Sequence, residues 1–159
     1  MSLGVGLKSI SFAGDFINGR FILTDKTDGQ FKDVSPADLN DQVLTVKYKL
    51  DHVDQACSAA KQAYLPWAKL TIDERKKYLL KLKEVFVAHE SQMAEVIARD
   101  TGKSLWDATT EAKALAGKID ITLNESIKLI QEERIKNALP QVDGVIRYRS
   151  RGVMAVIGP

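Results

Sequence analysis

The stretch Arg151-Gly-Val-Met-Ala-Val-Ile-Gly-Pro159 decides the fold that we expect for this chain. Its residues 153–157 are apolar without alternation, which is typical of a strand buried on both faces of a parallel sheet covered by helices. A parallel partner strand requires a crossover of roughly a dozen residues or more, and no earlier segment repeats the pattern. We therefore expect an α/β fold in which 151–159 is the first strand of a Rossmann-like parallel sheet. The sequence of 159 residues is then expected to be a truncated part of a larger protein.

The residues just before this stretch predict a strand with one basic face. In Val145-Ile-Arg-Tyr-Arg-Ser-Arg151, arginines alternate with other side chains at the period of a strand. Such a face is typical of a solvated surface or of a contact with another subunit, and an anionic substrate is an alternative. We do not expect nucleic acid, because no aromatic platform accompanies the arginines and the overall charge is balanced.

The middle of the chain predicts a layer of three helices. Apolar residues recur at steps of three and four over 51–68, 71–100 and 104–133, as on one face of an amphipathic helix. We expect Asp51 to cap the first helix and leave open a break in the second near Glu90-Ser91.

Two capping signals bound the second predicted helix. Thr71 and Glu74 have the spacing of a capping box, in which each side chain bonds the backbone N–H of the other residue. Gly102, after Thr101, can adopt the left-handed conformation that ends a helix. The stretch Thr101-Gly102-Lys103 does not have the glycine spacing of a phosphate loop, so we expect no phosphate site there.

The N-terminal part predicts short strands. Asn18-Gly19 stands between apolar pairs within 15–23, and this dipeptide tolerates the positive φ angles of a type I′ hairpin turn. We expect a polar loop over 24–33 and a third short strand over 43–46. Residues 1–14 are expected to form a flexible tail.

The composition is that of an ordinary globular protein. Hydrophobic residues make up 45% of the chain and charged residues 28%, and 23 Lys and Arg against 21 Asp and Glu give a net charge of +2. This balance argues against disorder and against a dedicated binder of nucleic acid or anionic membranes. We identify no signal peptide and no apolar run of the ~20 residues that a membrane span needs. The single cysteine is consistent with a reducing cytoplasm.

No catalytic or metal-binding group of residues emerges from the sequence itself. Residues 4–9 resemble a shortened phosphate loop but lack a preceding strand, so a tail is expected there. Cys57 lies on the apolar face of a predicted helix, where a buried core thiol is expected rather than a nucleophile. His52 and His89 are too isolated for zinc, and His89 is expected to be a partly buried helix residue.

Four stretches resemble, in the same order, the aldehyde dehydrogenase superfamily. Phe16-Ile-Asn-Gly-Arg-Phe21 resembles the strand that opens its members, and 63–68 with Glu74-Arg75 resembles a helical stretch that ends in an arginine. The third is Ala94 to Lys103, similar to a helix end in the family. The fourth is 151–159, similar to the strand that opens its dinucleotide-binding domain.

A finer resemblance is to the branch that oxidises N-succinylglutamate 5-semialdehyde. It rests on 101–111, 117–121 and 148–156. The chain departs from this pattern at Ser104 and Ser150, where relatives usually carry proline. We expect the loss of a fixed φ to loosen a helix start and a strand entry.

The resemblance implies an NAD-dependent oxidation by a cysteine nucleophile, a glutamate that activates water and an asparagine that stabilises the oxyanion. None of these three residues is expected in this chain, and Cys57 does not match the nucleophile motif. Among cofactor contacts, only Ile157 and Pro159 match positions at the start of the NAD cleft. Val142–Arg149 matches the arm that joins the sheet of another subunit in a homo-oligomer.

These expectations combine into one hypothesis and two alternatives. The leading hypothesis is the N-terminal part of a cytoplasmic NAD-dependent semialdehyde dehydrogenase of arginine catabolism, inactive alone. Its parts are the tail 1–14, a strand-and-helix part over 15–138 of the cofactor-binding domain, the arm over 139–150 and the strand over 151–159. The alternatives are half of a split enzyme and a non-catalytic helical interaction module.

Overall fold

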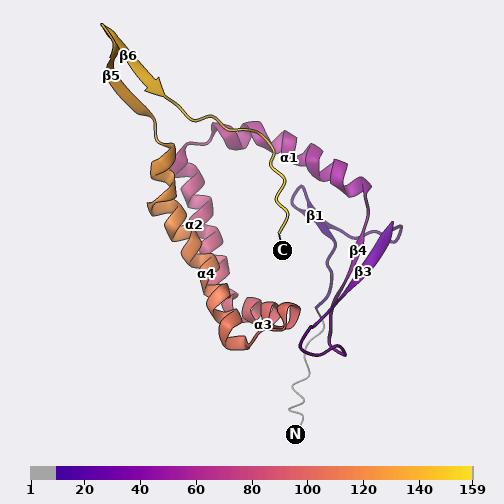
Figure 1. The fold of residues 1–159 in the computed structure, drawn as a ribbon. Helices are drawn as coiled ribbons and strands as arrows, with labels where there is room; N and C mark the ends of the chain where they lie inside the picture. The colour runs from indigo at the N-terminus through magenta and orange to yellow at the C-terminus, as the bar shows by residue number, and fades with distance from the viewer. Residues whose placement is uncertain (1–9, 159) are drawn as a thin grey trace.

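The computed structural model describes residues 10–158, and its elements form an open arrangement around the C-terminal segment (Figure 1). The N-terminal strands lie at one side, helices α1 to α4 follow around the other sides, and a hairpin projects outward. The elements are β1 (Asp15–Ile17), β2 (Arg20–Ile22), β3 (Gly29–Val34), β4 (Gln42–Tyr48), α1 (Asp51–Lys69), α2 (Ile72–Ala88), α3 (Glu90–Thr101), α4 (Leu105–Asn124), the 3₁₀ helix η1 (Ser126–Ile130), β5 (Glu133–Leu139) and β6 (Val142–Ile146).

The strands pair only in twos, and the expected first strand of a parallel sheet over 151–159 is not confirmed. The described strands form three antiparallel ribbons, β1–β2, β3–β4 and β5–β6. Residues 147–158, which we call the C-terminal segment, contain no strand. A strand needs backbone partners along its edge, and no described strand pairs with this segment. The mixed α/β character is confirmed, whereas the Rossmann-like sheet is not formed within the described residues.

The β1–β2 hairpin confirms the turn signal in the sequence. Asn18 and Gly19 have φ angles of 50° and 76°, and Ile17 pairs with Arg20 across the turn. Positive φ at both positions is the requirement of a type I′ turn. The rings of Phe16 and Phe21 face each other on the opposed strands, with centroids 5.0 Å apart.

Of the two strands in the β3–β4 ribbon, only β4 was predicted from the sequence. Strand β4 forms and extends the expected 43–46, but β3 occupies 29–34, mostly where a polar loop was expected. Gln30, Phe31 and Lys32 are exposed. A ribbon with little buried surface does not show the alternation of apolar and polar residues that marks a half-buried strand.

Helix α1 begins at Asp51, but this residue does not cap it. The N-cap position is Leu50, and its backbone N–H donates to Asp28 Oδ2 at 2.7 Å. The carboxylate that serves the helix start thus comes from the loop before β3, which local sequence does not reveal. Pro66 lies inside the last turn, and the helix continues to Lys69.

The second predicted helix is two helices that meet at His89. Thr71 and Glu74 form the expected capping box at the start of α2. The backbone N–H of His89 donates to the carbonyls of Val85 and Phe86, which closes α2 before α3 begins. His89 is exposed, so the expectation of partial burial is wrong. It occupies the corner between two helices rather than a helix face.

Gly102 ends α3 in the left-handed conformation, as expected, with φ of 70°. A Cβ there would also lie 3.1 Å from the Ala37 backbone nitrogen. Ser104 then caps α4 by accepting a hydrogen bond from the Asp107 N–H at 3.3 Å. Ser104, at a position where relatives usually carry proline, therefore caps the N-terminus of α4.

Helix α4 ends at Asn124, earlier than the expected 133. The apolar pattern continues through η1, whose tighter turn still repeats at steps of three. The next residues form β5, which pairs with β6. The predicted basic strand over 145–151 is therefore displaced, because β6 ends at Ile146 and pairs with β5 through the residues before it.

The described core is small and lies mainly between α3 and α4. Six hydrophobic residues are buried: Ile17, Val43, Ala94, Ala108, Ala112 and Ile119. Alanines let the two helices approach closely, and a Lys83–Asp120 ion pair of 2.7 Å joins α2 to α4. The chain exposes 13106 Å², whereas a compact monomer of this mass exposes about 7,900 Å².

Candidate functional site

The cysteine of this chain is not placed for nucleophilic catalysis. Cys57 is exposed on α1, so the expectation of a buried core thiol is wrong. Helix α1 packs on β1 near its start, where His52 is buried, and leaves the following turns uncovered. A catalytic thiol needs a base within hydrogen-bond reach, and no described hydrogen bond joins Cys57 to a histidine or a carboxylate.

His52 links α1 to the β1–β2 hairpin through its contact with Asp15. Its Nδ1 lies 2.6 Å from Asp15 Oδ2, and its side chain is buried while the carboxylate is part-exposed. The pair lines a hollow of about 350 Å³ together with Tyr48, Leu50 and Val53. The ring is thereby fixed between two elements. The described residues contain no group of three His, Cys, Asp or Glu side chains able to hold a metal ion.

A cluster of acidic groups around Arg99 joins α3 to the β3–β4 ribbon. Arg99 donates from Nε and Nη2 to the two oxygens of Asp41 at 2.9 and 2.7 Å, and both side chains are largely buried. These hydrogen bonds hold the pKa of Asp41 below its ordinary value. Burial, with a hydrogen bond to Asp100, raises the pKa of Asp33.

The Asp41–Arg99 contact is structural rather than catalytic. Arg99 is fixed in a bidentate pair, so its donors are engaged by Asp41. This pair is not predictable from local sequence, because its members are 58 positions apart. The only local signal is a charged residue on the apolar side of a helical pattern.

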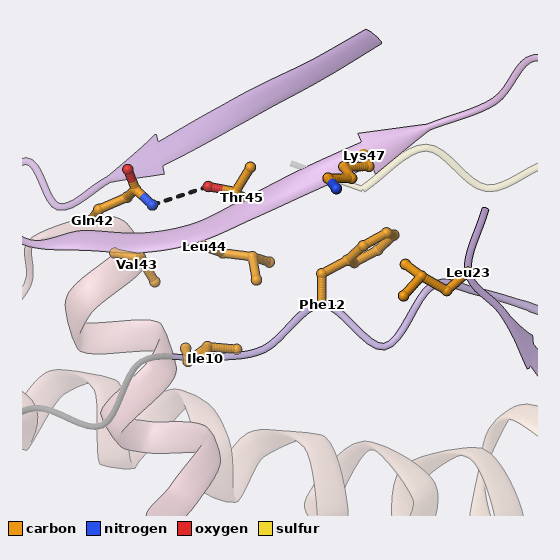
Figure 2. A pocket seen from close by; sticks show the side chains of 8 residues that line it. All are labelled: Ile10, Phe12, Leu23, Gln42, Val43, Leu44, Thr45 and Lys47. Carbon is orange, nitrogen blue, oxygen red and sulfur yellow. Dashed lines mark hydrogen bonds between the residues drawn. The ribbon is translucent and has the colours of Figure 1, made fainter. Parts of the chain in front are cut away.

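A mostly apolar hollow lies between β4 and the residues before β1. Figure 2 shows Ile10 and Phe12 facing Val43 and Leu44, with Leu23 beside Phe12; the volume is about 310 Å³. The polar groups at its rim include Gln42, whose Nε2 donates to Thr45 Oγ1 at 3.0 Å. With Lys47 as the one ionisable group among its lining residues, the hollow has no acid–base pair.

The prediction that Ile157 and Pro159 border a cofactor stays a prediction, because only one of the two residues is described. Ile157 is 97% exposed in the C-terminal segment, and Pro159 lies outside the described residues, as do residues 4–9, which were weighed as a phosphate loop. No helix begins within 147–158, so this segment offers no helix N-terminus to a pyrophosphate. The described residues do not fit a dinucleotide by themselves.

The predicted subunit arm, Val142–Arg149, covers β6 of the exposed β5–β6 hairpin and the first residues of the C-terminal segment. All residues of β5 are exposed, and in β6 only Gly144 is part-buried. Glu132 accepts hydrogen bonds from Arg147 at 2.7 Å and from Arg134 at 3.3 Å, which fixes the base of the hairpin. These contacts hold the pKa of Glu132 below its ordinary value. Both outer edges of the ribbon remain without strand partners among the described residues.

No helix among residues 10–158 combines the length and the apolar character needed to cross a bilayer.

Comparisons with known proteins place this fold. Residues 23–159 match the model of the aldehyde dehydrogenase family. The chain is 40% identical over 112 residues to the N-succinylglutamate 5-semialdehyde dehydrogenase of Vibrio cholerae serotype O1 (strain M66-2), a match that covers 69% of this chain and 22% of that protein.

Two solved structures share the fold at low sequence identity. The methylmalonate-semialdehyde dehydrogenase of Oceanimonas doudoroffii matches with a TM-score of 0.75 at 20% identity, over 88% of this chain and 28% of that one. An NAD-dependent aldehyde dehydrogenase of Sinorhizobium meliloti matches with a TM-score of 0.75 at 18% identity, over 87% and 28% of the two chains. The matches thus span 22–28% of the length of these proteins.

Proposed function

The chain belongs to the aldehyde dehydrogenase family, and from this premise we propose that it is the N-terminal part of an NAD-dependent enzyme that oxidises N-succinylglutamate 5-semialdehyde to N-succinylglutamate. The 40% identity to a dehydrogenase named for this substrate supports the substrate class. The reaction consumes the aldehyde, NAD⁺ and water, and it yields the carboxylic acid, NADH and a proton. Its place would be arginine breakdown in the cytoplasm.

The chain's own contribution to this reaction is scaffolding. The family's nucleophilic cysteine, glutamate and asparagine are not expected in this sequence, and Cys57 has no base partner among the described residues. What the residues provide is a capped helical layer that positions the C-terminal segment. We therefore expect no dehydrogenase activity from the 159 residues alone.

One observation carries the proposal: residues 153–157 of the C-terminal segment are apolar and yet exposed. Val156 and Ile157 are 86% and 97% exposed, although their neighbours in sequence are also apolar. Exposure of contiguous apolar residues marks a surface that another part of a protein covers. The total exposed area, which exceeds that of a compact monomer by roughly 5,000 Å², supports the same conclusion for the whole chain.

We also propose the organisation of the intact enzyme. Residues 15–138 would form the strand-and-helix part of the cofactor-binding domain, and 151–159 would become the first strand of its parallel sheet. Ile157 and Pro159 would then border the nucleotide. The arm over 139–150 would carry Val142–Arg149 to the sheet of a second subunit in a homo-oligomer.

A chimera tests the proposal. Residues 1–159 would replace the corresponding part of the Vibrio cholerae relative, and NADH formation would be followed at 340 nm with N-succinylglutamate 5-semialdehyde and NAD⁺. We expect NADH from the chimera and from the intact relative, and none from the 159 residues alone. Robust NADH formation by the short chain, or a folded chimera without activity, would contradict the proposal.

A non-catalytic interaction module is the second candidate, because α1 and α2 also expose apolar side chains. Val53, Leu65, Trp67 and Tyr78 are each at least 45% exposed. Sedimentation of the purified chain separates the candidates. A stable, monodisperse monomer favours the independent module, whereas aggregation that is relieved by the missing part of the enzyme favours the split or truncated dehydrogenase.

A further inference from the structure

A hollow lined by arginine and tyrosine side chains lies where α1, α2 and the C-terminal segment meet. Helix α1 contributes Tyr64 and Ala68, α2 contributes Arg75, and the C-terminal segment contributes 148–151; Ile130 of η1 also lines it. Its volume is about 890 Å³, within the roughly 300–1,000 Å³ of small-molecule sites. Described residues alone form it, and none of them takes part in the chemical steps of the proposed dehydrogenase reaction.

The charge in this hollow has one sign. Arg75, Arg149 and Arg151 line it, and no Asp or Glu is among its lining residues. The described ion pairs of this region join Arg134 and Arg147 to Glu132 and include none of these three arginines. The hollow beside these three arginines thus has no carboxylate among its lining residues.

Arg75 adds a second, independent observation. Its Nε is buried and has no hydrogen-bond partner among the described residues. A buried N–H donor without a hydrogen-bond acceptor costs free energy. A ligand oxygen that accepts from this N–H would remove that cost. Arg75 lies in the first turn of α2, whose start is fixed by the Thr71–Glu74 capping box.

The two arginines of the C-terminal segment are held at the hollow by Tyr64. Its hydroxyl lies 2.9 Å from Ser150 Oγ and donates to the Ser150 carbonyl at 3.3 Å. Ser150 stands between Arg149 and Arg151, so this contact fixes the stretch that carries both. Residues far apart in the sequence are thereby brought together at the hollow.

We propose that this hollow binds a small oxyanion with at least two negative charges, either a phosphate ester or a di- or tricarboxylate. Guanidinium groups present pairs of N–H donors that match carboxylate and phosphate oxygens. Three positive charges without a described counter-charge favour a multiply charged ligand over a single carboxylate. An extended nucleic acid is disfavoured, because the chain carries a net charge of only +2.

Calorimetric titration of the full chain tests the proposal, with inorganic pyrophosphate and citrate as probes and acetate as the singly charged comparison. We expect at least one multiply charged probe to bind about tenfold or more tightly than acetate. The R149A/R151A variant should weaken that binding by about tenfold. The matched control R134A/R147A removes the same charge from the hairpin base and should stay within about twofold of wild type.

Three results would overturn the proposal: no binding of either probe to the folded chain, binding of acetate as tight as theirs, or equal loss in both double variants, which would indicate a general charge effect. Pyrophosphate and citrate separate the phosphate class from the carboxylate class.

Chemical protection supplies a readout that does not require the variants to fold. Phenylglyoxal modification, followed by mass spectrometry, would be compared with and without the bound probe. We expect protection of Arg75, Arg149 and Arg151 by the probe and unchanged modification of Arg20 on the first hairpin. Uniform protection of all four, or none, would contradict the proposal.

Discussion

The α3–α4 pair and the C-terminal segment both carry apolar residues, but only the helices bury some of theirs. Ala94, Ala108 and Ala112 are almost fully buried, whereas Val156 and Ile157 are almost fully exposed. A helix forms its backbone hydrogen bonds within itself, so only its apolar face needs to pack against another element. An extended segment depends on neighbouring strands for its hydrogen bonds. The difference teaches that the helices bury apolar surface within this chain, whereas residues 153–157 would need further strands, which the proposed enzyme would supply, to bury theirs.

The largest expected effect comes from charging the C-terminal segment in the assembled enzyme. In the chimera, Ile157→Asp would bury a carboxylate within the proposed sheet, at a cost of several kcal/mol. We expect NADH formation to fall by roughly a hundredfold or more. In the short chain, where Ile157 is exposed, the same change should alter the free energy of unfolding by less than about 0.5 kcal/mol.

Leu39→Asp is the matched control, because Leu39 is 81% exposed in the loop between β3 and β4. Equal activity of the Ile157→Asp chimera and the parent chimera would contradict the proposed burial of Ile157 in the assembled enzyme.

Overpacking the helix pair should destabilise the short chain itself. Ala108 has no exposed surface, so Ala108→Leu would force α3 and α4 apart, at a cost of about 1–3 kcal/mol. Urea unfolding followed by far-UV circular dichroism measures the change. Ala114→Leu, at an exposed position of the same helix, should stay near wild type. A small effect at both positions would show that the helices do not pack as described.

Removing the cap of α2 should have a smaller effect. Thr71→Ala deletes the oxygen that accepts from the Glu74 N–H at 3.2 Å, and we expect a loss of about 1 kcal/mol in the free energy of unfolding. Thr110→Ala, on the exposed side of α4, serves as control. Equal unfolding curves for the two variants would indicate that α2 is held by tertiary contacts rather than by its cap.

The smallest expected effect is a change in the pH dependence of stability. Arg99 lowers the pKa of Asp41 from its ordinary 3.8 in the folded chain. The stabilisation is therefore present above that value and is lost as pH falls through the folded pKa. Urea midpoints measured from about pH 5 to about pH 3 should decline less steeply for Asp41→Asn than for wild type. Exposed Asp25→Asn should leave the decline unchanged, and a parallel decline for Asp41→Asn would contradict the assignment.

The sequence predicted those parts of the fold whose cause is local. Asn18-Gly19 and the Thr71–Glu74 box act within four residues, and both form as expected. Strands β3 and β5 were missed because their side chains are largely exposed and carry no alternation. The Asp41–Arg99 pair was missed because nothing local couples residues so far apart.

The candidate site was less predictable than the fold. Cys57 was expected in a core, but the face of α1 that carries it is not covered in the described part of the chain. The basic segment was recognised, yet its hollow requires Tyr64 and Arg75 from two helices. Side chains brought together by tertiary packing leave no spacing signal in the sequence.

Hydrogen–deuterium exchange of residues 153–157 tests the central claim most directly. In the short chain we expect their amides to exchange as fast as those of an unfolded peptide, while α3 and α4 remain protected. In the active chimera, the amides of 153–157 should become protected, because they would join the parallel sheet. Protection of 153–157 already in the short chain, or fast exchange in an active chimera, would contradict the account.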